Sequence, residues 1–219
     1  MRFIYLHGFA SSPESAKAVY LRKAFAGLDI SLEIPDLNQE DFSHLTITRQ
    51  LQQVARMFPP DGTPVTLIGS SLGGLTSAWL GQQHSQVQRL VLLAPAFGFL
   101  SHWLPKLGEK QLTQWEASGY LSVYHYGEGR RAKRPASLTL PLHYKFVEDA
   151  HQYQETQLSR PVPTLILHGQ HDQTIPLHAS RDYASVRPWV QLIEFDSDHA
   201  LIDVMPEIWK AIQLFCQLS

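Results

Sequence analysis

The sequence has few charged residues and almost no cysteine. Charged residues make up 17% of the 219 positions, and the formal net charge is −2. This balance provides no broad basic surface, so we expect no nucleic-acid partner and no attraction to an acidic membrane. The single cysteine, Cys216, excludes an internal disulfide framework and suits a reducing compartment.

Long apolar runs are also missing, and no stretch reaches the length of a membrane-spanning helix. The chain opens on a short apolar strand instead of a basic and then apolar leader. We therefore expect a cytoplasmic protein without stable membrane insertion. Hydrophobic residues are abundant, at 44%. They suffice for one sizeable core, and we expect a single domain over residues 1–219.

Short apolar strands alternate with helical patterns along most of the chain. The predicted strands are residues 2–6, 31–34, 65–69, 90–94, 164–168 and 190–195. The first helix is expected to start with Ser12 as its N-cap and Pro13 as its first helical residue (N1), and to end near Gly27. Such alternation predicts an α/β fold, with a six-stranded, mostly parallel sheet and helices on both faces. Ligands of such sheets bind at the carboxyl ends of the strands.

Residues 97–158 break this alternation, because about sixty residues are too many for an ordinary connection between strands. We expect an inserted helical lid. Its apolar residues at helical spacing are Phe99, Leu100, Trp103, Leu104 and Leu107. This stripe either packs against the body of the protein or lines an acyl-binding site, and the sequence leaves both open. In the second case Phe99, Trp103 and Leu104 contact the substrate.

The same insert contains a dense basic patch, formed by Arg130, Arg131, Lys133 and Arg134. A solvated loop tip is the ordinary explanation for such a patch. The alternative is a docking site for an anionic part of the substrate, such as the phosphates of a coenzyme A thioester.

A run of β-forming residues ends at Gly69, and a helical pattern opens just after Ser71, in the stretch Gly69-Ser70-Ser71-Leu72-Gly73. This is the G-x-S-x-G nucleophile elbow between a strand and a helix, where the flanking glycines make room for a sharp turn. An ordinary Ser/Gly turn or a phosphate cradle is the alternative, but the lysine of a phosphate cradle is missing. The nicotinamide-binding pattern G-x-G-x-x-G is absent too.

A serine nucleophile needs a base and an acid that orients the base. Asp172 and His199 each follow a predicted strand, in the order Ser, Asp, His that this fold uses. Asp196 or Asp198 could replace Asp172 as the acid. His7 and His168 also follow strands, but each adjoins a glycine and is better interpreted as shaping its loop.

A metal site is the other interpretation of His168, His171 and Asp172. These residues lack the spacings of zinc ligands, and no second Cys/His group supports them. We therefore expect no metal.

Acyl transfer also needs two amide donors for an oxyanion. The amide of Leu72, at the start of a helix, can provide one of them. The other is expected from the loop after an earlier strand, where Phe9 of His7-Gly8-Phe9 is the best candidate.

The chain resembles the α/β-hydrolase superfamily, and within it the small bacterial esterases of the YqiA-like group. The stretches that carry the resemblance are residues 5–9 with 11–13, 34–37, 69–74, 93–96, 168–169 with 172, and 198–199. The resemblance implies an esterase or thioesterase that acts on small acyl substrates without a cofactor. A ligand-binding protein or sensor that lacks turnover is the competing function. The sequence does not indicate an oligomeric state.

Overall fold

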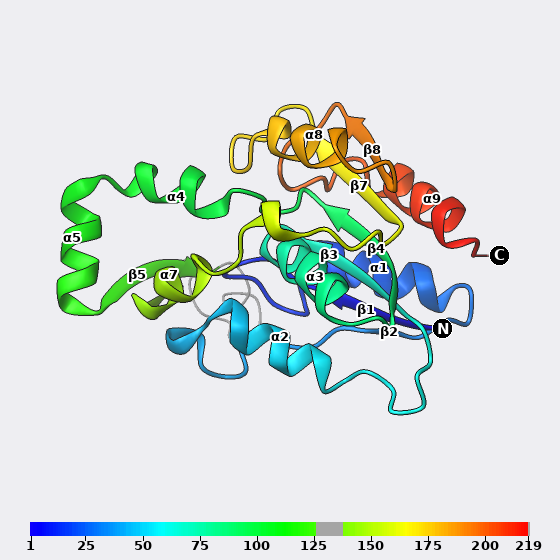
Figure 1. The fold of residues 1–219 in the computed structure, drawn as a ribbon, viewed down its shortest axis with the longest axis horizontal. Helices are drawn as coiled ribbons and strands as arrows, with labels where there is room; N and C mark the ends of the chain where they lie inside the picture. Colours follow the sequence, from blue (N-terminus) through cyan, green and yellow to red (C-terminus); the bar gives the residue numbers. More distant parts are fainter. Residues whose placement is uncertain (126–137, 219) are drawn as a thin grey trace.

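A computed structural model describes residues 1–125 and 138–218 (Figure 1). Within these ranges, six parallel strands form one sheet in the order β2-β1-β3-β4-β7-β8. Their bounds are β1 Arg2–Leu6, β2 Leu32–Glu33, β3 Val65–Ser70, β4 Val87–Leu93, β7 Thr164–Gly169 and β8 Val190–Phe195. The predicted six-stranded α/β sheet is confirmed.

Helices cover both faces of this sheet. Their bounds are α1 Ala16–Ala26, α2 Ile47–Ala55, α3 Leu72–Gln83, α8 Leu177–Ser185 and α9 Met205–Cys216, with a 3-10 turn η1 at Phe42–His44. The alternation of side chains along each strand creates two cores. Ile4 and Leu6 of β1 belong to the core under α2, α3 and α8, whereas Phe3 and Tyr5 belong to the core under α1 and α9.

Two predicted helices differ at their ends. Helix α1 begins at Ala16, and its N-cap is Ser15, whose side chain accepts a hydrogen bond from the amide of Ala18. Ser12 instead lies in a preceding turn, in which its carbonyl accepts from the amide of Ser15. The apolar positions Ile47, Leu51, Val54 and Phe58 predict a second helix, and α2 begins at Ile47 but ends at Ala55, ahead of Phe58.

The connection between β4 and β7 is the insert, which contains α4 Phe99–Leu107, α5 Glu109–Ser118, β5 Tyr120–His125, β6 Leu138–His143, α7 Lys145–Ala150 and a 3-10 turn η2 at Glu155–Gln157. Strands β5 and β6 pair antiparallel, which the sequence analysis did not predict. Figure 1 shows α4, α5 and β5 projecting away from the end of the molecule where both termini lie. Arg130, Arg131, Lys133 and Arg134 lie outside the described residues.

No helix in the described part of the chain is long and apolar enough to cross a membrane. Cys216 is buried at the end of α9, in the core under α1 and α9. Burial raises the pKa of its thiol to about 11, so the thiol stays protonated at neutral pH.

Candidate active site

The elbow between β3 and α3 holds Ser71 in an unusual backbone conformation, with φ 53° and ψ −118°. The sharp turn requires glycine on both sides because other chain segments approach closely. A Cβ atom on Gly69 would lie 2.3 Å from the carbonyl oxygen of Gly73. A Cβ atom on Gly73 would lie 2.2 Å from the carbonyl oxygen of Leu6. Sequence spacing and backbone geometry therefore agree on Ser71 as the residue that the turn presents.

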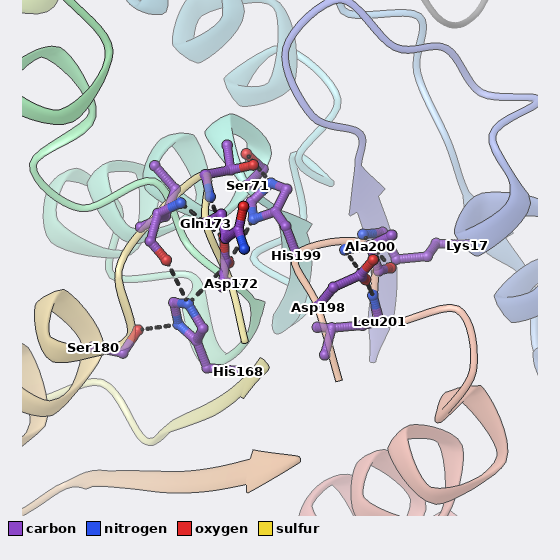
Figure 2. A network of polar contacts seen from close by, with 12 residues as sticks. Lys17, Ser71, His168, Asp172, Gln173, Ser180, Asp198, His199, Ala200 and Leu201 are labelled. Carbon is purple, nitrogen blue, oxygen red and sulfur yellow. Dashed lines mark hydrogen bonds and ion pairs between the residues drawn. The ribbon is translucent and has the colours of Figure 1, made fainter. Parts of the chain in front are cut away.

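The structure brings Ser71, His199 and Asp172 together in one chain of hydrogen bonds (Figure 2). Nε2 of His199 lies 3.2 Å from Oγ of Ser71, and its Nδ1 lies 2.6 Å from Oδ2 of Asp172. Since an ionised carboxylate only accepts hydrogen bonds, the proton of the neutral imidazole is on Nδ1. Nε2 is then free to accept the hydroxyl proton of Ser71.

The two alternative acids lie elsewhere. Asp196 is exposed and pairs with His171 at 2.7 Å. Oδ1 of Asp198 accepts hydrogen bonds from the amides of Ala200 and Leu201, so this side chain shapes the loop that carries His199. Asp172 is thus the carboxylate in contact with His199. His171, which the metal interpretation grouped with Asp172, makes its contact with Asp196 on the surface.

The carboxylate of Asp172 is buried and accepts four hydrogen bonds. Its Oδ1 accepts from the amides of Thr174 and Ile175, at 2.8 and 2.9 Å. Its Oδ2 contacts His199 and also Nε2 of His168, at 3.1 Å. Burial alone would raise the pKa of Asp172, but the hydrogen bonds from His168 and His199 outweigh burial and hold it well below its usual range. Asp172 is therefore ionised at neutral pH.

His168 is fully buried beneath Asp172 and is a contact that the sequence analysis missed. Its Nε2 also lies 3.1 Å from the carbonyl oxygen of Ile175, so this nitrogen carries the proton that both oxygens accept. Its Nδ1 then accepts from the hydroxyl of Ser180, at 2.7 Å. The loop-shaping role expected for His168 is compatible with this position, but the side chain also reaches the acid. Its spacing of four residues from Asp172 is the only signal in the sequence.

The amides of Phe9 and Leu72, the two candidate oxyanion donors, have no backbone acceptor among the described residues. Leu72 is the first residue of α3, where helical amides lack partners. The loop of Phe9 lies against the elbow, since a Cβ atom on Gly8 would be 3.3 Å from Cβ of Ser71. His7 anchors this loop, because its Nε2 accepts from the amide of Leu37 at 3.0 Å and its Nδ1 donates to the carbonyl of Gly8.

A cavity of about 610 Å³ opens beside Ser71 and His199. Phe99 and Trp103 line this cavity, as expected for contacts with a substrate. Leu104 does not, because it lines a separate cavity of about 520 Å³ between α4 and the segment that follows α7.

The insert rests on the loop of the candidate oxyanion donor. The ring of Phe9 packs against the rings of Phe99, Trp103 and Phe146, at centroid distances of 5.9, 5.4 and 5.4 Å. Phe99 and Trp103 of the apolar stripe thus pack against the body of the protein and also border the cavity beside Ser71.

The sheet order, the elbow and the positions of the three side chains define an α/β-hydrolase fold. Solved structures with this fold are similar to nearly the whole chain. They include alpha/beta hydrolase domain-containing protein 10 from mouse, with 22% identity, a TM-score of 0.77 and coverage of 99% of this chain and 90% of that chain. Est1E from Butyrivibrio proteoclasticus has 18% identity, a TM-score of 0.69 and coverage of 96% and 86%. A monoacylglycerol lipase from Paleococcus ferrophilus has 17% identity, a TM-score of 0.69 and coverage of 99% and 94%.

The family itself follows from the sequence. Residues 2–216 match the model of the uncharacterised protein family UPF0227, and the chain belongs to that family. The resemblance to the superfamily and to its YqiA-like group is thereby confirmed.

Proposed function

We propose that the protein is a serine hydrolase that cleaves carboxylic esters or thioesters through an acyl-enzyme intermediate. The observation that carries this proposal is the hydrogen-bond chain from Asp172 through His199 to Ser71. A receptor without turnover has no need of an ionised acid, an oriented base and a hydroxyl in this order. The names of the similar structures, which include a hydrolase and a lipase, support the same reaction class.

In the acylation step, Oγ of Ser71 attacks the carbonyl carbon while Nε2 of His199 takes the hydroxyl proton. Asp172 holds the Nδ1–H tautomer and stabilises the imidazolium that forms. The imidazolium then protonates the leaving oxygen or sulfur, and the acyl group stays on Ser71. In deacylation, His199 takes a proton from water, the hydroxide attacks the acyl-enzyme, and the free acid leaves as the proton returns to Ser71.

The tetrahedral intermediate carries a negative oxygen, which the amides of Phe9 and Leu72 bind in this proposal. Both amides lack a backbone acceptor among the described residues, so no existing bond has to break. Removal of one such donor in another serine hydrolase costs about 2.7–4 kcal/mol of transition-state stabilisation. Phe99 and Trp103 form the apolar wall of the cavity and are our candidates for contact with the acyl group.

The test combines covalent labelling with turnover. We expect a fluorophosphonate probe to label Ser71, and the wild-type protein to hydrolyse members of a panel of acyl esters and thioesters of graded chain length. Ser71→Ala should lose labelling and lower kcat by roughly six orders of magnitude, as in another triad enzyme.

Ser70→Ala is the matched control. The hydroxyl of Ser70 is buried beside Tyr5 and not hydrogen-bonded to His199, so this variant should keep most of the activity. Labelling that persists in Ser71→Ala would contradict the assignment. Absence of both labelling and turnover in the wild-type protein would instead favour a binding protein or sensor.

A further inference from the structure

The cavity beside Ser71 has two chemically different walls. The insert contributes mainly apolar side chains, with the polar residues Gln111, Ser122 and Tyr124 among them; the apolar ones are Phe99, Trp103, Leu107, Leu121 and Val123. The segment before α1 contributes Ser11 and Ser15, and the first turn of α1 contributes Lys17. Among the described residues that line the cavity, none has a carboxylate, and Lys17 is the only lysine or arginine. A purely apolar acyl substrate has no use for this second wall.

The ammonium of Lys17 has unused hydrogen-bonding capacity. Its Nζ donates one hydrogen bond, to the carbonyl oxygen of Ala200 at 2.9 Å (Figure 2). None of the ion pairs found between described residues involves Lys17. Two of its three N–H donors thus remain for a ligand.

The contact with Ala200 also places Lys17 relative to the reaction. Ala200 directly follows His199, the residue that protonates the leaving group in the proposed mechanism. The ammonium is therefore held on the histidine side of the site, where the alcohol or thiol part of a substrate leaves. The apolar wall of the insert remains for the acyl part.

Lys17 is partly buried, and a buried ammonium is unfavourable unless something offsets its lost hydration. Burial lowers the pKa of Lys17 to about 8, while the charges of Asp172 and Asp198 act in the opposite direction. The other titratable side chains that line the cavity are those of His199, Tyr5 and Tyr124. Lys17 is hence mostly protonated at neutral pH and loses its charge as the pH rises through about 8. Asp172 and Asp198 offset only part of the effect of burial, and a bound anion would add to this compensation.

We propose that Lys17 binds an anionic group, a carboxylate or a phosphate, on the alcohol or thiol part of the substrate. The proposal rests on the serine-hydrolase function proposed above and narrows it. The substrates are then acyl esters or thioesters whose leaving group is negatively charged.

The experiment compares butyrate esters that differ in charge on the leaving group. The anionic substrates are 4-carboxyphenyl butyrate and 4-phosphonooxyphenyl butyrate, and the neutral one is 4-carbamoylphenyl butyrate. The readout is the ratio of kcat/KM for an anionic ester to kcat/KM for the neutral ester. We expect wild type to favour an anionic ester, and the anion with the larger ratio identifies the group that is bound.

Lys17→Met keeps most of the aliphatic stem and removes the charge. This variant should lower the ratio by roughly tenfold, which is the effect expected from the loss of one charge-assisted hydrogen bond. Lys17→Arg should keep a preference for the anion. Lys23→Met is the matched control, because Lys23 is an exposed lysine on the same helix, and its loss should leave the ratio unchanged.

The pH dependence separates recognition from a structural role. The wild-type ratio should fall as the pH rises through about 8, since kcat/KM reports groups of the free enzyme. In Lys17→Arg the ratio should persist to higher pH, because arginine stays protonated.

Two results would overturn the proposal. Equal losses on the anionic and neutral esters in Lys17→Met would mean that Lys17 acts only through Ala200, by positioning the loop of His199. If the wild-type enzyme is labelled at Ser71 but shows no preference for anionic esters, the assignment of an anionic leaving group is wrong, while the hydrolase function still holds. Failure of the hydrolase function itself is distinguished by the absence of labelling at Ser71 together with no turnover of any ester, and it would remove both proposals.

Discussion

The sheet and the insert border the same cavity but are built in different ways. At the sheet edge, Ser71, Asp172 and His199 are held by short polar contacts and by backbone segments that leave no room for a Cβ atom. The insert instead presents aromatic rings that pack against Phe9 at tilted angles, between 33° and 59°. Directional contacts suit the bond-making step, whereas apolar packing suits selection of the acyl group. Changes on the two sides should therefore differ in size and in kind.

The largest effect is expected on the sheet side, from Asp172→Asn. An asparagine can still accept from the amides of Thr174 and Ile175, so the loop should stay folded. Its amide group would, however, favour the wrong tautomer of His199 and leave Nε2 unable to accept the proton of Ser71. We expect kcat to fall by about 10⁴, the loss seen for this change in another triad enzyme.

Asp196→Asn is the control for that change, because Asp196 is exposed and pairs with His171 away from the site. Its kcat should match that of wild type, and both variants should keep the wild-type circular dichroism spectrum. A large loss of kcat in Asp196→Asn, together with an active Asp172→Asn, would show that Asp172 only shapes its turn and is not the catalytic acid.

A smaller effect, dependent on chain length, is expected on the insert side. Trp103→Ala removes part of the apolar wall, and each buried CH₂ contributes about 0.8 kcal/mol. The ratio of kcat/KM for an octanoyl ester to kcat/KM for an acetyl ester should fall roughly tenfold. A loss of this size corresponds to the burial free energy of fewer than two methylene groups.

Leu104→Ala provides the matched control, since Leu104 belongs to the same helix but lines the separate cavity. This variant should leave the octanoyl-to-acetyl ratio unchanged. Equal losses on both esters in Trp103→Ala would show that Trp103 only supports the loop of Phe9.

The smallest effect is expected far from both regions, at Cys216. Its thiol is buried under the opposite face of the sheet, and its pKa of about 11 keeps the reactive thiolate scarce at neutral pH. Treatment of the native protein with iodoacetamide should change kcat/KM by less than about twofold, the scatter we expect when no catalytic group is modified. Mass spectrometry should detect alkylation of Cys216 only after unfolding. Rapid alkylation with loss of activity would contradict this placement.

The contrast between the two regions also explains which features the sequence predicts. Ser71 was predictable because its turn demands glycines at fixed offsets, and Asp172 and His199 because each follows an apolar strand. The sheet follows from the same alternation. By contrast, β5 and β6 were missed although Leu121 and Val123 alternate with polar neighbours. Pro141 inside β6 weakens the strand pattern there, and the pairing depends on contacts such as that of Trp115 with the carbonyl of Leu142.

Side chains that act through tertiary contacts were beyond the reach of the sequence. Lys17 is indistinguishable from any lysine on an amphipathic helix until the chain folds and places it beside Ala200. The placement of Leu104 outside the Ser71 cavity likewise depends on how α4 rotates against α7 and η2. The start of α1 at Ala16 was decided by a local turn between Ser12 and Ser15, which competed with an equally good capping pattern.

The left-handed backbone at Ser71 has a consequence for the evolution of this fold. A residue with a side chain in this backbone conformation lowers the stability of the fold by about 1–3 kcal/mol, whereas glycine adopts the same conformation without this loss. A glycine at position 71 would therefore make the fold more stable and would remove the hydroxyl at the same time. A screen of random mutants for thermostability alone should therefore enrich variants that have lost the nucleophile. A screen for stabilised variants has to include turnover as a second criterion.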